Sequence, residues 1–222
     1  MQVDIINLAL PAPLDRTPRS RGVHLSNVIR VIGAQNGSLK PEYVESLDLV
    51  DASTLEWWGR LTLVNQLRVA IGLAWEEWYL PQLAPLGIVD HPGEMERDGI
   101  YMTHDGESID VLRTERGENQ MVLALHEVKT TYKSTRTVGD SLSRQWMLLS
   151  QAKGYCKGLN TLLAYIHMLF ICGDYSYPIS PLLRIYKIIF TQAEVDDNWD
   201  VITSYVEHHR QQLAEDSMRG TT

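Results

Sequence analysis

A short segment in the second half of the chain places an acid and an amine side by side. Glu127 and Lys129 stand two positions apart at the end of the apolar run Met121–Val128. Residues two apart in a β-strand point to the same face of a sheet, so we expect Glu127 and Lys129 to project together while Val128 faces the core. The carboxylate could bind a divalent metal ion, and the amine could steady an attacking water molecule or stabilise phosphate charge. The pattern E-x-K is common, so it requires a partner.

A second acid is expected across a β-hairpin. If the hairpin turns near Gly117, antiparallel pairing puts position 105 opposite about position 129, and position 110 opposite about position 124. Asp105 is therefore the better partner for Glu127 and Lys129. Asp110 remains the alternative if the register differs, and Asp105-Gly106 could also be an ordinary turn.

Two carboxylates beside a lysine suggest a specific chemistry. Mg²⁺ and Mn²⁺ prefer oxygen ligands, which Asp105 and Glu127 supply, and the backbone carbonyl oxygen of Val128 could complete the coordination sphere. A bound metal ion lowers the pKa of a water molecule and stabilises charge on a phosphate during in-line displacement. The sequence thus predicts a divalent-metal site suited to phosphodiester hydrolysis.

In this arrangement the chain resembles the PD-(D/E)XK nuclease superfamily, and within it the RecB-like and phage exonuclease branch. His104 departs from the pattern, since proline often precedes the motif aspartate, and the long interval from Asp105 to Glu127 suggests an extended hairpin. The resemblance covers residues 72–155 and consists of four segments, namely Gly72–Glu76, Thr103–Gly106, Glu127–Lys129 and Gln151–Tyr155.

The resemblance implies an α/β fold with a central mixed β-sheet flanked by helices, and metal-dependent hydrolysis of DNA. It implies that Glu76 supports the metal ion or its water, and that Gln151 and Tyr155 orient the site or contact the substrate backbone. The implied role is an exonuclease in recombination or repair, encoded by a phage. The alternatives are an endonuclease of the same fold and a catalytically inactive member that binds DNA or a protein.

Hydrophobic periodicity and punctuation predict the elements that position these residues. The Thr191/Glu194 pair has the spacing of a capping box, Ser26 is a candidate cap for a helix through Ile32, and Pro81 and Pro85 end the first long helix. The predicted elements are a helix from 53 or 54 to about 80, a hairpin over 100–130, a helix over 141–158, strands over 162–172 and 184–191, and a helix over 193–213. We divide the chain into an N-terminal arm with a short helix (1–50), a nuclease-like domain (51–214) and a disordered tail (215–222).

The chain of 222 residues has a net charge of −8, and this value by itself argues against a nucleic-acid partner. The distribution of the charges along the sequence changes that interpretation. The segment from position 128 to position 158 contains six basic residues and one acidic residue, Asp140, and therefore has a local net charge of +5. We therefore predict DNA contacts from Lys133, Arg136, Arg144 and Lys153, although a solvated helix face would look the same.

The composition also limits the partners that we expect. The two cysteines, Cys156 and Cys172, are too few for a four-cysteine iron–sulfur cluster, so we predict none. The longest apolar run, 162–172, is too short to span a bilayer, and we expect a cytoplasmic protein, in the host cytoplasm if phage-encoded. A homo-oligomer or a recombination partner protein is compatible with the sequence.

Overall fold

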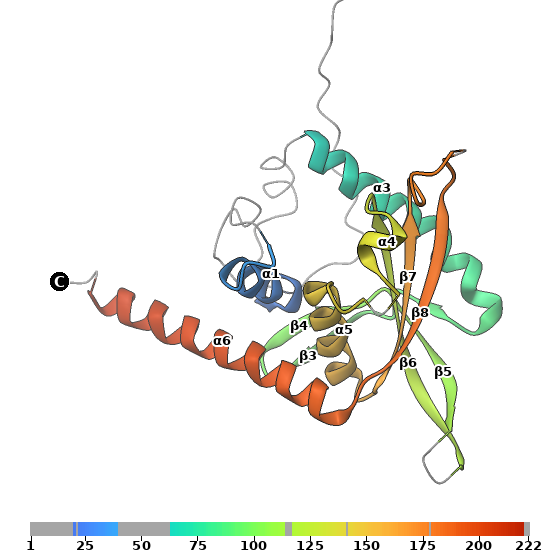
Figure 1. Ribbon diagram of the computed structural model, residues 1–222. Coiled ribbons are helices and arrows are strands. Elements are labelled where there is room, and N and C mark those ends of the chain that lie inside the picture. Colours follow the sequence, from blue (N-terminus) through green and yellow to red (C-terminus); the bar gives the residue numbers. More distant parts are fainter. Residues whose placement is uncertain are drawn as a thin grey trace, which may run out of the picture.

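The computed structural model describes residues 20, 22–39, 63–113, 117–140, 142–177 and 179–219 of the chain (Figure 1). Its centre is a five-stranded sheet in the order β2-β5-β6-β7-β8, in which β6 and β7 run parallel and the other neighbours run antiparallel. The predicted mixed sheet is confirmed. Its strands are β2 (Val89–Asp90), β5 (Gly106–Arg113), β6 (Asn119–Thr131), β7 (Leu163–Phe170) and β8 (Leu182–Ile189).

The parallel pairing of β6 and β7 requires a crossover connection, and helices α4 (Thr135–Val138) and α5 (Trp146–Leu159) provide it. The helix predicted over 141–158 therefore begins five residues later than expected. Ser134 caps α4, since its side chain accepts a hydrogen bond from the backbone N–H of Thr137.

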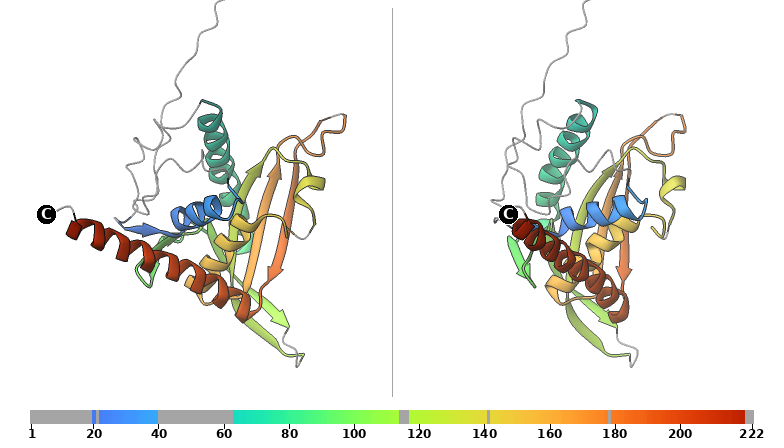
Figure 2. Two further views of the ribbon diagram at one scale, coloured as in Figure 1. Left: turned by 60° about the vertical axis from the view of Figure 1, so that its left-hand side comes forward. Right: turned by 90° about the vertical axis from the view of Figure 1, so that its left-hand side faces the viewer.

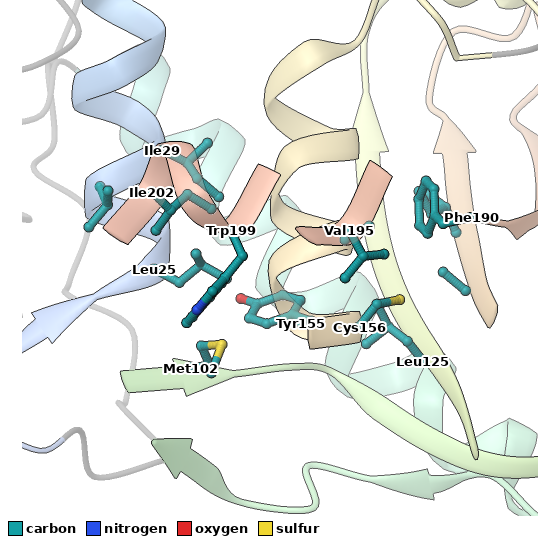
Figure 3. Packing of buried hydrophobic residues seen from close by; sticks show 14 of the residues in the cluster. Leu25, Ile29, Met102, Leu125, Tyr155, Cys156, Phe190, Val195, Trp199 and Ile202 are labelled. Atoms are coloured by element: carbon teal, nitrogen blue, oxygen red, sulfur yellow. The ribbon is translucent and has the colours of Figure 1, made fainter. Parts of the chain in front are cut away.

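One face of the sheet is covered by three helices (Figures 1 and 2). Helix α5 lies against the sheet, and α1 (Leu25–Gln35) and the long C-terminal helix α6 (Gln192–Arg219) pack with it. Figure 3 shows Leu25 of α1, Trp199 of α6 and Tyr155 of α5 in this main core, with Leu125 of β6. Because α1 belongs to the main core, it is more than an appended arm.

The opposite face of the sheet carries a smaller core. Helix α3 (Leu63–Tyr79) and the 3-10 helix η2 (Leu80–Leu86) supply Tyr79, Leu80 and Leu83, which pack with Val128 of β6. The α-helix ends before Pro81, as predicted. The beginning of this helix, predicted at residue 53 or 54, lies outside the described residues, and so does the domain boundary at residue 50.

The predicted hairpin over 100–130 is wrong in its first part. Strand β4 (Ile100–Thr103) pairs with β3 (Glu94–Arg97) and with β1 (Val23–His24), which form a separate three-stranded sheet. The hairpin comprises only β5 and β6. His104 and Asp105 consequently lie at the junction between the two sheets, where β4 ends and β5 begins.

The helix ends differ from the predictions in two further places. Ser26 lies inside α1, and His24 occupies the N-terminal cap position without a side-chain hydrogen bond. Helix α6 runs to Arg219, beyond the predicted end at 213. Its capping box is confirmed, because the backbone N–H of Thr191 donates to Glu194 Oε2 at 2.9 Å and that of Glu194 donates to Thr191 Oγ1 at 3.2 Å. No helix in the described ranges has the length and apolarity to cross a bilayer.

Candidate active site

Strand β6 brings Glu127 and Lys129 to the same face of the sheet, as their spacing predicted. Both project to the side covered by α5, while Val128 is buried in the smaller core on the other side. The side chain of Glu127 is 1% exposed and that of Lys129 is 33% exposed, and the two form an ion pair. Apart from this pairing, the carboxylate oxygens of Glu127 accept no hydrogen bond from the described residues.

Asp105 joins this pair from the junction of β4 and β5. Its Oδ2 accepts a hydrogen bond of 2.7 Å from the backbone N–H of Val128 and lies 3.5 Å from Lys129 Nζ. The backbone N–H of Val128, which lies between Glu127 and Lys129 in the chain, thus fixes the orientation of the Asp105 carboxylate. The structure brings Asp105, Glu127 and Lys129 together, as the sequence predicted.

The register that produces this meeting differs from the predicted one by two residues. Gly106 pairs with His126, and Asp110 pairs with Val122 rather than with position 124. Asp110 faces the opposite side of the sheet, where its Oδ2 lies 3.2 Å from Lys187 Nζ and accepts a hydrogen bond from Tyr165. The structure therefore places Asp110 away from Glu127 and Lys129.

The three charged groups perturb one another strongly. Burial and the negative charge of Asp105 together raise the pKa of the Glu127 carboxyl to about 8, although Lys129 partly opposes the shift. Burial alone would lower the pKa of Lys129, but Asp105 and Glu127 outweigh burial and raise it above its usual value. A buried carboxyl with a raised pKa next to a lysine that stays charged is typical of a functional site.

Tyr155 and Gln151 approach the same site from α5. Gln151 Nε2 donates a hydrogen bond of 2.9 Å to Tyr155 Oη, as expected for residues one helical turn apart. Tyr155 is buried, and burial together with the charge of Glu127 raises its pKa. The hydroxyl therefore stays protonated at neutral pH and can donate a hydrogen bond.

Glu76 approaches from α3 and is held by a residue that the sequence analysis missed. His91 Nε2 lies 3.1 Å from Glu76 Oε1, and the backbone N–H of His91 donates to the carbonyl oxygen of Asp105 at 2.9 Å. Burial raises the pKa of Glu76, and the charge of Asp105 adds to the shift. No spacing in the sequence links position 91 to position 105, and the short pairing of β2 with β5 brings them together.

His91 also has an unusual backbone conformation, with a φ of 44°. Residues other than glycine are uncommon in this left-handed region, although His, Asn and Asp are enriched there. Such conformations persist where the surrounding contacts hold them, and they cluster at functional sites. His104 is buried, and its Nε2 lies 3.3 Å from Glu107 Oε2.

Behind the site, on the opposite face of the sheet, lies a chain of hydrogen-bonded side chains, each pair 2.9 Å apart. Tyr79 Oη contacts His167 Nδ1, His167 Nε2 contacts His126 Nδ1, and His126 Nε2 contacts Ser108 Oγ. Burial lowers the pKa of both histidines to about 4, so both are neutral at physiological pH. The chain ties α3 to three strands of the sheet.

The residues predicted to contact DNA do not form one cluster. Arg136 and Arg144 are exposed, and Lys133 is exposed with its Nζ 3.5 Å from Gln145 Oε1. Lys153 has structural partners, since its Nζ lies 3.9 Å from Glu194 Oε1 and 5.5 Å from the ring centroid of Phe190. These contacts place Lys153 at the beginning of α6.

The chemistry of the acidic residues fits a hard divalent cation. Asp105 and Glu127 supply carboxylate oxygens, and the Glu127 oxygens lack hydrogen-bond donors other than Lys129. Within the described ranges, no three His, Cys, Asp or Glu side chains form a complete set of ligands. Mg²⁺ is usually held by one or two carboxylates together with water and substrate phosphates, so two carboxylates are sufficient.

Comparisons with known proteins give the fold a precedent. No protein-family model and no curated protein matches the chain. Among solved structures, a phage-related exonuclease from Haemophilus somnus 129PT has a TM-score of 0.52 and 11% identity, covering 88% of this chain and 96% of that one. The alkaline exonuclease LHK-Exo from Laribacter hongkongensis, in complex with dAMP, has a TM-score of 0.52 and 10% identity, covering 90% and 93%. The α/β fold is thus one that exonucleases also have.

Proposed function

We propose that the chain is a divalent-metal-dependent nuclease that hydrolyses phosphodiester bonds in DNA. The observation that carries this proposal is the meeting of Asp105, Glu127 and Lys129 from two neighbouring segments, with a buried carboxylate that the protein itself leaves largely without hydrogen-bond donors. The similarity of the fold to two exonucleases supports it.

In this proposal Asp105 and Glu127 hold Mg²⁺ or Mn²⁺, with the carbonyl oxygen of Val128 as a further ligand and Glu76 in support of the metal ion or its water. A divalent ion bound there supplies a water of lowered pKa and compensates phosphate charge. Lys129 remains charged beside both acids and orients the attacking water or stabilises the charge that develops on the phosphate.

Other residues position the substrate. Tyr155, held by Gln151, donates its hydroxyl proton to the site or to the substrate backbone. Lys133, Arg136 and Arg144 are exposed and contact phosphates, while Lys153 contributes only if it leaves Glu194. We further propose that the reaction is exonucleolytic and serves recombination or repair, as the resemblance to phage exonucleases implies.

The test is to incubate the purified protein with linear duplex, circular duplex and single-stranded DNA in Mg²⁺, Mn²⁺ or EDTA. We expect the loss of linear DNA only, which indicates an exonuclease, whereas the loss of circular DNA would indicate an endonuclease. Lys129→Ala is expected to lower the rate by about 100-fold or more. Lys187→Ala, which removes the lysine paired with Asp110 on the other face, is the control and should retain activity.

Two results would reject a catalytic role for this site. The first is the absence of turnover with every metal ion, and the second is full activity of Lys129→Ala. Either result would favour a member of the fold that binds DNA or a protein without cleaving it.

A further inference from the structure

A second group of side chains with the chemistry of nucleic-acid binding lies beyond the end of β6. We call it the aromatic–basic surface. The segment after β6 and the loop between β7 and β8 contribute to it, and in Figure 1 this loop lies at the same end of the sheet as α3 and α4. The surface consists of Arg68, Tyr132, Lys133, Tyr175 and Tyr177.

Direct contacts connect three of its members, Arg68, Tyr132 and Tyr175. The guanidinium carbon of Arg68 in α3 lies 5.6 Å from the ring centroid of Tyr132, within cation–π range. The hydroxyl of Tyr175 donates a hydrogen bond to the backbone carbonyl of Tyr132. Three separate segments of the chain are thus joined around Tyr132.

The nearby acids are engaged with other groups. Asp174 Oδ1 accepts a hydrogen bond of 3.0 Å from the backbone N–H of Thr135, and Asp140 Oδ1 lies 2.8 Å from Arg184. Within the described part of the chain, Arg68 and Lys133 form no ion pair with an acidic side chain. Their positive charges therefore remain available to phosphates.

The two tyrosines of the loop between β7 and β8, Tyr175 and Tyr177, are exposed to solvent rather than packed against the core. Tyr177 is 97% exposed and Tyr175 is 56% exposed. An aromatic ring in this position contributes little to the stability of the fold, but its face is free for stacking. Bases stack on aromatic side chains without sequence preference where they are unpaired, and neighbouring cations hold the backbone.

The surface begins three residues beyond Lys129 in the chain. Tyr132 follows Lys129 by three positions along β6 and its continuation, which corresponds to about 10 Å at the rise of an extended strand, and its contact with Arg68 lies on the side of the sheet that α3 covers. A DNA strand rises about 3.4 Å per nucleotide, so roughly three nucleotides would cover that interval.

We propose that the aromatic–basic surface binds the single-stranded part of the DNA substrate by stacking of unpaired bases on Tyr175 and Tyr177. Arg68 and Lys133 hold the phosphates of the same strand. This inference rests on the proposed function in naming DNA as the substrate, but binding to the surface does not require cleavage.

The test measures the affinity of a labelled oligothymidylate for the full chain in EDTA by fluorescence anisotropy, so that no hydrolysis occurs. Tyr177→Ala is expected to weaken binding about 5- to 100-fold, from the stacking free energy of one base, and Tyr177→Trp should restore it. Affinity for blunt duplex DNA of the same length should change much less. Met121→Ala is the control, since Met121 is 73% exposed at the far end of the β5–β6 hairpin.

Three results would overturn the inference. They are the absence of oligothymidylate binding by the unaltered chain, equal affinities of Tyr177→Ala and Met121→Ala, and failure of Tyr177→Trp to restore binding. A Tyr177-dependent affinity in a chain that cleaves no DNA would retain the surface while rejecting the proposed hydrolysis.

Discussion

Glu127 illustrates how a single buried residue links the site to stability. Its pKa of about 8 lies above the ordinary value of 4.5, so the folded chain holds this proton over a pH range in which the unfolded chain has lost it. The free energy of unfolding then decreases as pH rises from about 4.5 to 8. A metal ion that binds the ionised carboxylate would oppose this loss.

Glu127→Gln tests this linkage, because glutamine preserves the shape of the side chain without the ionisation. In EDTA, the melting temperature of the unaltered chain should decrease between pH 6.5 and 8.5 relative to that of Glu127→Gln, by at least about 2 °C. Thermal unfolding followed by circular dichroism measures it. Asp200→Asn, an exposed site on α6, serves as the control, and parallel pH curves for all three proteins would contradict the prediction.

His91 has the geometry of a positioning residue, since its backbone contacts Asp105 and its ring contacts Glu76. We expect His91→Ala to lower kcat about 10- to 100-fold, the usual effect of losing a group that orients a ligand, with little change in KM. His91→Gln should restore part of the rate by returning a polar group to Glu76. The measurement is steady-state cleavage of linear DNA.

His91→Gly separates the ring from the backbone. Glycine adopts the φ of 44° without strain but has no side chain to contact Glu76. If His91→Gly were as active as the unaltered chain, the imidazole would have no positioning role and only the backbone conformation would matter.

At the scale of elements, the sequence predicted features set by neighbouring residues better than it predicted which strands pair and in which register. The E-x-K spacing, the capping box at Thr191 and the break at Pro81 depend on residues close in the chain, and all three are as predicted. The predicted hairpin register was two residues off because the position of Asp105, at the junction of β4 and β5, depends on long-range contacts. The pairing of β4 with β3 has no signal in the hydrophobic alternation of residues 100–112.

Two further positions, one in the main core and one in the site, could not be predicted from the sequence for the same reason. Ser26 has the residue type of a helix cap, but Leu25 is buried in the main core and α1 already begins at Leu25, one residue before Ser26. His91 joins Asp105 only through the pairing of β2 with β5. Tertiary packing decided both positions, and local propensity could not.

Helix α3 carries Glu76, and its attachment to the sheet should therefore affect activity. Tyr79 lies one turn after Glu76 and is hydrogen-bonded to His167, which is buried. Tyr79→Phe leaves a buried histidine nitrogen without its partner, at a cost of about 1–3 kcal/mol in the free energy of unfolding. We also expect a lower kcat, because α3 would no longer hold Glu76 in place.

Urea denaturation and DNA cleavage of Tyr79→Phe measure the two effects. The matched control is Tyr205→Phe, which removes a hydroxyl that accepts a hydrogen bond from Gln35 between α1 and α6. A loss of kcat in both variants would show that Tyr79 acts through general stability rather than through the position of Glu76.

At the scale of the whole molecule, the ionisable groups on the two faces of the sheet change the free energy of unfolding with pH in opposite directions. The pKa values of His126 and His167 fall from 6.5 to about 4 in the folded chain. Between these values the unfolded chain binds more protons, so their contribution increases with pH and is complete above about 6.5. Glu127 contributes in the opposite sense between about 4.5 and 8.

Below pH 6.5 the histidines with lowered pKa values, His104, His126 and His167, outnumber the carboxyls with raised pKa values, Glu76 and Glu127, and above it only the carboxyls act. The melting temperature in EDTA at constant ionic strength is therefore expected to pass through a maximum near pH 6.5. Glu127→Gln should reduce the decline above that pH, whereas added Mg²⁺ should raise the melting temperature at alkaline pH in the unaltered chain only. A melting temperature that decreases steadily from pH 5 to 8 would mean that the two histidines keep their protons in the folded chain, and the neutral chain of hydrogen bonds behind the site would then be the wrong description.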